Sequence, residues 1–93
     1  MKSTMKTDLR TIPGVGAQIE RDLIALGYDS VASLAGEDPE QIYERDCIRR
    51  GCRVDRCMLY VYRCAVYYAD HAEHEPEKLR WWYWKDKPYV LRR

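Results

Sequence analysis

The stretch Ile12-Pro13-Gly14-Val15-Gly16 interrupts the helical pattern near the start of the chain. Pro13 fixes its φ angle and has no N–H, and the two glycines accept φ angles that other residues avoid. The stretch therefore predicts a tight turn that leads into the N-terminus of a helix. Backbone N–H groups and the positive end of the helix dipole would then face an anion, for which a phosphate is the natural ligand.

Helical spacing of apolar residues surrounds this turn. We therefore predict an all-α protein of about five helices, since no segment alternates like a strand between turn signals. Proline, glycine and capping residues set the expected ends, as at Asp38-Pro39, where an aspartate caps a helix that begins with proline. The expected helices cover about 6–11, 17–26, 31–35, 39–50 and 54–72, and a turn from residue 76 precedes the aromatic string 81–84.

The segment 54–72 carries the longest apolar stripe in the chain. Its apolar residues recur every three or four positions, which places them on one helix face: they are Cys57, Tyr60, Val61, Cys64, Ala65 and Tyr68. We expect this helix to be the centre of the core, with Cys57 and Cys64 buried, reduced and free of metal. Tyr62 and Tyr67 lie off the stripe, so either the C-terminal tail or a partner chain is expected to cover that side.

Composition indicates a globular protein with one core. The chain has 93 residues, of which 46% are hydrophobic and 33% are charged. It has no apolar stretch long enough to cross a bilayer and no signal-peptide core, so we expect a cytoplasmic protein with its four cysteines reduced. The net charge of +1 does not by itself indicate a nucleic-acid partner, but residues 47–64 hold five arginines against one acidic residue.

The order of these signals resembles a helix-hairpin-helix domain: Leu9-x-x-Ile-Pro-Gly-Val-Gly, an amphipathic helix ending at Leu26-Gly27-Tyr28, then Ser30-Val31-x-x-Leu34 and Asp38-Pro39-Glu40. Two later strings are more specific: Val54-Asp55-Arg56-Cys57-x-Leu59-Tyr60-Val61-Tyr62-Arg63-Cys64-Ala65-Val66-Tyr67-Tyr68-Ala69 and Trp81-Trp82-x-Trp84-Lys85-Asp86. With them, roughly residues 8–86 resemble the pathogenicity-locus (Cdd) family of small bacterial proteins, some of which are labelled mitomycin-resistance proteins. The resemblance implies a helix-hairpin-helix (SAM-like) fold and an expectation of DNA binding, and it implies no established activity.

The chain is expected to consist of a helical domain between two tails. These segments are an N-terminal tail (1–7), a helix-hairpin-helix domain (8–72) and an aromatic C-terminal tail packed on that domain (73–93). Three tryptophans within four residues would make a large exposed apolar patch. We therefore expect at least two of Trp81, Trp82 and Trp84 to pack on the fifth helix as a lid, the alternative being that they stack on nucleobases.

Two loops are expected to contact the phosphate backbone of DNA. At the first loop, a phosphate would bind the N–H groups of Gly14, Val15 and Gly16, with Lys6 and Arg10 nearby. The second loop would act as a degenerate second hairpin on the opposite strand, through four arginines: Arg49, Arg50, Arg53 and Arg56.

Each loop also has a structural alternative. Ala17 stands where DNA-binding hairpins commonly have a lysine, and Glu20 and Asp22 add negative charge, so the first loop could be an interhelical turn only. The arginines of the second loop could pair with the acidic block at residues 37–46.

The residues indicate no enzyme, cofactor or metal site. The chain has no P-loop, no serine with a histidine near it in sequence and no C-x-x-C unit, and His71-x-x-His74 is expected to be a solvated helix end. We expect a non-sequence-specific DNA-binding protein, linked to DNA repair or uptake, with no membrane partner. The alternative is a protein–protein interaction module, binding another protein or a second copy of itself, that uses the hairpin only as a structural turn.

Overall fold

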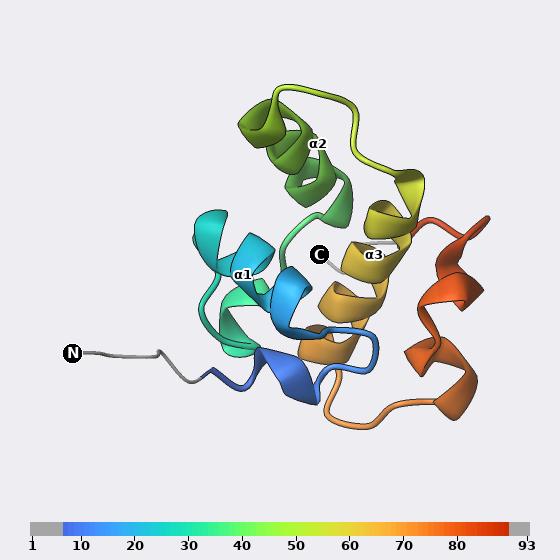
Figure 1. Cartoon of the computed structure of the whole chain (residues 1–93). Helices are drawn as coiled ribbons and strands as arrows, with labels where there is room; N and C mark the ends of the chain where they lie inside the picture. Colours follow the sequence, from blue (N-terminus) through green and yellow to red (C-terminus); the bar gives the residue numbers. More distant parts are fainter. Residues whose placement is uncertain (1–6, 90–93) are drawn as a thin grey trace.

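A computed structural model describes residues 7–89 of the chain. Within this range the protein is all-α, as predicted, and contains no strand (Figure 1). None of these helices is long and apolar enough to cross a membrane. The α-helices are α1 (Ala17–Ala25), α2 (Pro39–Arg50) and α3 (Arg56–Asp70). The 3-10 helices are η1 (Leu9–Thr11), η2 (Ala32–Leu34), η3 (Pro76–Leu79) and η4 (Trp81–Trp84).

The prediction of about five helices is corrected to three α-helices, because the first and third expected helices are the short 3-10 helices η1 and η2. Pro13 disfavours the α conformation in the residue before it, and Ile12 is accordingly extended. Gly36, at a φ of +78°, ends the η2 segment before an α-helix could gain enough hydrogen bonds to form. Residues 1–6, which include the expected start of the first helix, and residues 90–93 lie outside the described residues.

Helix α2 begins and ends where local signals predict. Asp38 accepts a hydrogen bond from the Glu40 N–H at 3.0 Å, and proline occupies the first helical position, where no N–H is needed. At the other end Gly51 is left-handed with a φ of +70°, and the Cys52 N–H donates to the Cys47 carbonyl at 3.2 Å. Local chemistry therefore sets both ends of this helix.

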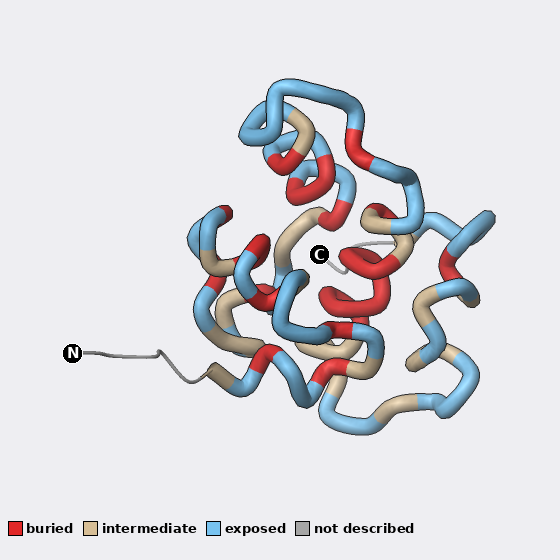
Figure 2. Tube along the Cα trace, in the orientation of Figure 1, coloured by how far each residue is buried: buried red, intermediate tan, exposed pale blue. Residues whose placement is uncertain are grey.

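Helix α3 runs through the centre of the molecule and is buried on more than one side (Figure 2). Every residue from Val61 to Tyr67 is buried. Helix α2 and η2 pack on α3, and the η3–η4 tail packs on it from another side (Figure 1). A helix covered on one side buries a single stripe. Because α3 is covered on two sides, Tyr62 and Tyr67 belong to the core although they lie off the predicted stripe.

The prediction that Cys57 is buried is wrong. Cys57 lies in the first turn of α3 and is exposed, whereas Cys64 is fully buried against Tyr67 and Trp84. Helical spacing sets the direction of a side chain, but a neighbouring element must also cover it. Both thiols are free, and burial raises the pKa of Cys64 to about 11.

The C-terminal tail folds back along α3 and packs two of the three tryptophans on the core, as predicted. Trp84 is buried, and its ring lies 5.6 Å from that of Tyr67. Arg63 of α3 donates to the Trp84 carbonyl at 2.8 Å. Trp81 is half-buried against the core, whereas Trp82 is 55% exposed. The tail, rather than a partner chain, therefore covers the side of α3 that carries Tyr67.

Candidate nucleic-acid interface

The loop between η1 and α1, residues 12–16, is a tight turn that precedes the N-terminus of α1, and we call this loop the hairpin. Gly14 is left-handed with a φ of +90°, and the Val15 N–H donates back to the Ile12 carbonyl at 3.1 Å. Val15 is buried and anchors the turn in the core. Of the three amides predicted as phosphate ligands, that of Val15 is therefore already used within the turn.

Neighbouring amides of this turn are open. Within residues 7–89, the N–H groups of Gly14, Gly16 and Ala17 donate to no protein atom, and no side chain caps α1. Unpaired amides at the start of a nine-residue helix carry the positive end of its dipole. Apart from Gly16 and its two chain neighbours, no residue comes within 4 Å of the position where a Cβ of Gly16 would stand, so this side of the turn is open.

Arg10 supplies a positive charge beside the turn and neutralises Glu20. The Arg10 Nε donates to one carboxylate oxygen of Glu20 at 2.9 Å, and the Thr7 hydroxyl donates to the other at 2.5 Å. The hydrogen bond from Thr7 first, and then that from Arg10, lower the pKa of Glu20. The Arg10 side chain remains 59% exposed. The carboxylate expected to repel a phosphate is therefore balanced by a guanidinium that solvent can reach.

Trp81 of the tail packs directly against the hairpin. A Cβ on Gly14 would stand 3.3 Å from Cδ1 of Trp81, which is closer than an ordinary contact. This contact and the positive φ both favour glycine at position 14. Figure 1 shows the tail running beside this loop. The tail therefore supports one side of the candidate site.

Arg49 and Arg50, at the end of α2, form a charge cluster with two aspartates. Arg49 contacts Asp46 at 2.9 Å and Asp22 of α1 at 3.2 Å, and Arg50 contacts them at 3.0 Å and 2.7 Å. The alternative in which these arginines pair with the acidic block 37–46 is thus confirmed for Asp46. The cluster has no net formal charge, so these arginines add little positive field to the surface.

Asp46 lies at the centre of this cluster and is completely buried. Tyr62 of α3 donates to its second carboxylate oxygen at 2.7 Å. Burial alone raises the pKa of Asp46, but the hydrogen bonds from Tyr62, Arg50 and Arg49 outweigh burial and leave the pKa lowered. One ionised carboxylate therefore joins α2 to α3 and, through the arginines, to α1.

The loop between α2 and α3 leaves Arg53 and Arg56 exposed. The Asp55 carboxylate accepts a hydrogen bond from the Cys57 N–H at 2.9 Å and so occupies the N-terminus of α3. A carboxylate there would repel a phosphate, so this loop does not repeat the first hairpin. Figure 1 places it at the N-terminal end of α3, away from the hairpin beside the other half of that helix. Of the predicted arginines, the structure brings only Arg10 to the hairpin.

A groove of about 520 Å³ beside this loop was not indicated by the sequence. Its lining includes Tyr43 and Cys47 of α2 and the exposed Arg53. Ile48, on the rim, is 79% exposed. One sequence feature could have indicated this groove: an isoleucine that lies off the apolar face of α2, next to two arginines.

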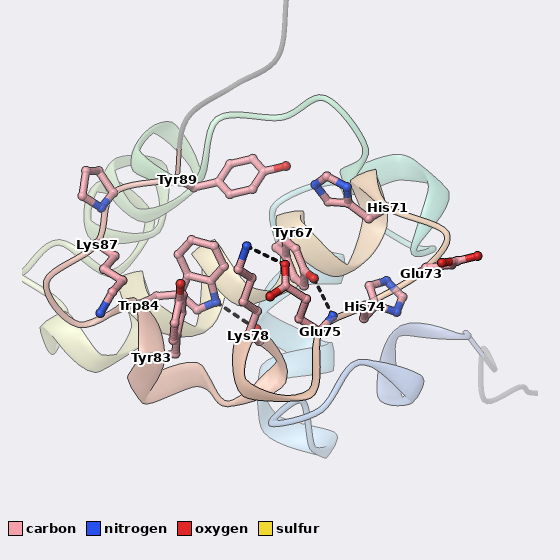
Figure 3. Close-up of a pocket in the computed structure, with 11 residues that line it drawn as sticks. Tyr67, His71, Glu73, His74, Glu75, Lys78, Tyr83, Trp84, Lys87 and Tyr89 are labelled. Atoms are coloured by element: carbon pink, nitrogen blue, oxygen red, sulfur yellow. Dashed lines mark hydrogen bonds and ion pairs between the residues drawn. The ribbon is translucent and has the colours of Figure 1, made fainter.

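A second cavity, of about 620 Å³, lies between the tail and the end of α3 (Figure 3). Its walls carry aromatic and charged side chains from both segments, including Tyr67, His71, His74, Lys78, Tyr83, Trp84 and Tyr89. His71 and His74 are half-buried beside Tyr67, with ring centroids 4.8 and 5.7 Å from it, rather than solvated as predicted. Among the described residues, no three His, Cys, Asp or Glu side chains gather as metal ligands.

Sequence comparison places the chain among known proteins. A protein of Streptomyces lavendulae named mitomycin resistance protein McrB is 33% identical over 91 residues, which cover 98% of this chain and 84% of that protein. No solved structure matches the chain significantly. The family described as "Pathogenicity locus" matches residues 2–88, which contain the hairpin and both aromatic strings. The chain therefore belongs to the pathogenicity-locus (Cdd) family.

Proposed function

We propose that this protein is a cytoplasmic helix-hairpin-helix protein that binds the phosphate backbone of DNA without reading its sequence. The observation that carries the proposal is the turn at residues 12–16 and the start of α1, where the amides of Gly14, Gly16 and Ala17 are open and the exposed Arg10 pairs with Glu20 of the same helix. A link to DNA repair or uptake is part of the same proposal.

A phosphate suits this turn for electrostatic reasons. Its oxygens accept hydrogen bonds from unpaired amides, and the dipole of α1 adds partial positive charge at the same place. The Arg10 guanidinium cancels the negative charge of Glu20 through their ion pair and stays 59% exposed, so that carboxylate no longer opposes a phosphate at the amides. Contacts of this kind position DNA but carry no sequence information. We expect weak binding to duplex or branched DNA, with a Kd of roughly 10⁻⁴–10⁻⁶ M at physiological salt.

Arg53 and Arg56 would form a second, separate contact. Their loop lies at the N-terminal end of α3, away from the hairpin (Figure 1), so it would meet the phosphate backbone at a different place. Arg49 and Arg50 contribute less, because aspartates already balance their charges.

The substitution Gly16→Asp tests the amide contact. Gly16 is extended, with a φ of −101°, and has free space at its Cβ position, so aspartate fits without strain. Aspartate is also a preferred N-cap, so its carboxylate would occupy the amides and keep α1 at least as stable. We expect the variant to melt no lower than the wild-type protein and to bind DNA at least about tenfold more weakly, through loss of a phosphate contact.

Fluorescence anisotropy with a labelled duplex at two salt concentrations measures this effect. Gln41→Glu is the matched control, because it adds one negative charge at an exposed position outside the turn. The wild type and this control should bind with similar affinity and lose it as salt rises. The proposal fails if the wild type shows no binding at low salt, or if Gly16→Asp binds as well as the control.

The second candidate function is a protein-interaction module in which the hairpin is only a turn. The exposed Ile48 beside the 520 Å³ groove favours it, because a solvent-facing isoleucine gains from burial by a partner. Sedimentation equilibrium of the wild type and of Ile48→Asp tests whether that partner is a second copy. A dimer that dissociates in the variant would support this function, and a monomer at all concentrations would contradict self-association.

The relative from Streptomyces lavendulae offers a cellular test, since it is named for mitomycin resistance. We propose that this chain confers the same phenotype through the hairpin. Survival of a sensitive bacterial host on mitomycin is then expected to rise with the wild-type chain and not with Gly16→Asp at equal protein level. Equal survival with the wild-type chain and with Gly16→Asp would contradict a role of the hairpin in this phenotype.

A further inference from the structure

Trp82 is the one tryptophan that the tail leaves outside the core. Its side chain is 55% exposed, although Trp81 and Trp84 on either side of it pack inward. The carbon between the guanidinium nitrogens of Arg80 lies 6.0 Å from the Trp82 ring centroid, within cation–π range. An exposed indole that holds an arginine offers both an apolar face and a positive charge to a ligand.

The position of Trp82 connects it to the hairpin. The Trp82 ring meets the Trp81 ring edge to face, with centroids 5.6 Å apart at 89°. Trp81 in turn contacts Gly14, so Trp82 stands one side chain away from the proposed phosphate site. The packing of Trp81 therefore sets the distance between an exposed aromatic face and a set of open amides.

The charge around Trp82 fits a polyanion. From residue 80 to residue 89 the tail carries Arg80, Lys85 and Lys87 against one acidic residue, Asp86. All four side chains belong to exposed residues. A nucleotide of a DNA strand fits these features. Its base offers an aromatic ring to Trp82, and its phosphate offers a negative charge to the tail and the hairpin.

We propose that Trp82 stacks on an unpaired nucleobase while the hairpin holds a phosphate of the same DNA. This inference rests on the proposed function and narrows its substrate to DNA with single-stranded segments, such as overhangs, gaps and forks. Bases inside a duplex are covered by their neighbours and cannot offer a free face to an indole. Stacking on an aromatic side chain tolerates any base, because every base has a π face, so the site remains independent of sequence.

Four DNA ligands of equal total charge test the proposal: a blunt duplex, a duplex with a single-stranded overhang, the same overhang made of abasic nucleotides, and a single strand. We expect the wild-type protein to bind the overhang roughly fivefold to hundredfold more tightly than the blunt duplex, as expected for one stacked base. The abasic overhang should lose that gain while keeping its charge. Tryptophan fluorescence should be quenched by the normal overhang and not by the abasic one.

Variants assign the effect to Trp82. Trp82→Ala should lower the affinity for the overhang to the level of the blunt duplex and abolish the quenching, while Trp82→Phe restores part of both. Gln41→Ala is the matched control, since it shortens an exposed side chain on α2 that lies outside the hairpin, the tail and the groove beside Arg53. Thermal melting of each variant checks that the fold is retained.

The outcomes separate this inference from the proposed function. If the blunt duplex binds in a salt-dependent manner and the overhang adds nothing, the stacking site is refuted and the hairpin function stands. If Trp82→Ala keeps the full preference for the overhang, some other residue carries it and the assignment to Trp82 is wrong. If no DNA is bound even at low salt, the proposed function fails and the stacking site fails with it.

Discussion

Replacing Asp46 by asparagine is expected to destabilise the fold by about 3 kcal/mol. Asp46 is completely buried and accepts hydrogen bonds from Arg49 at 2.9 Å, Arg50 at 3.0 Å and Tyr62 at 2.7 Å. An asparagine has one oxygen and one NH₂ group, so it cannot accept hydrogen bonds from the tyrosine and from the two arginines at the same time. The substitution therefore removes the negative charge from the cluster and leaves at least one buried donor without its acceptor.

The magnitude follows from these contacts. A hydrogen bond to a charged group contributes roughly 1.5–3 kcal/mol, but each arginine side chain is 34% exposed, so we take about 1 kcal/mol for each. The buried donor that loses its acceptor adds about 1 kcal/mol, the lower end of the usual range, which brings the total to about 3 kcal/mol. A protein of 93 residues has a free energy of unfolding of roughly 5–14 kcal/mol, so the change is a large part of the total. The melting temperature should fall by roughly 10–25 °C.

Urea denaturation followed by far-UV circular dichroism measures the change, with three further variants beside Asp46→Asn and the wild type. Glu44→Gln is the matched control, because it removes a carboxylate from an exposed position of the same helix. Tyr62→Phe should cost roughly 1–2 kcal/mol by removing one donor. The double variant should lose less than both single changes together, since the two side chains share one hydrogen bond. The role assigned to Asp46 is refuted if its variant unfolds at the same urea concentration as Glu44→Gln.

Three further outcomes follow from the packing and the pKa shifts. Trp84→Ala is expected to lower the free energy of unfolding by about 3 kcal/mol in the same assay, because it empties a buried site, while Trp82→Ala changes it by less than about 0.5 kcal/mol. The pKa of Asp46 is lowered in the folded protein, so its charged form stabilises the fold above a pH of about 4. This stabilisation is lost as the pH falls through the folded pKa. Between about pH 6 and pH 2, the urea midpoint of the wild type should therefore fall, and that of Asp46→Asn should fall less. A thiol reagent should label the exposed Cys57 in the folded protein, more slowly than an unperturbed thiol because the hydrogen bond with Asp55 raises the pKa of Cys57. The same reagent should reach Cys64 only on unfolding, and equal rates at the two thiols would contradict the packing of the tail over Cys64.

Local signals in the sequence predicted the structure correctly wherever neighbouring residues determine the backbone conformation. Asp38, Pro39 and Gly51 set the ends of α2 through hydrogen bonds and φ angles within a few residues. Pro13 and Gly14 likewise determine the hairpin. The same reasoning overestimated the first and third helices, because segments this short gain too few hydrogen bonds to offset the nucleation of an α-helix.

The candidate site was predictable only in part. The hairpin and Arg10 lie within seven residues of each other, so their proximity follows from the chain itself. The contact between Trp81 and Gly14 joins residues 67 positions apart, and no local pattern announces it. The Val15 N–H was predicted to bind a phosphate, but it donates a hydrogen bond to the Ile12 carbonyl inside the turn. The spacing of the glycines does not predict this hydrogen bond.

The sequence by itself determined the all-α class, the turn at residues 12–16 and the span of α2, because turn and capping chemistry act locally. It also predicted that tryptophans of the tail pack inward, without saying which of them. Only the tertiary structure decided which side chains are covered. Cys57 and Cys64 have the same place in the helical pattern, yet the tail covers one and not the other. Arg49 became a structural residue because the fold brings Asp22 to it from another helix. Burial and ion pairing depend on what stands opposite a side chain, and that neighbour is supplied by distant parts of the chain.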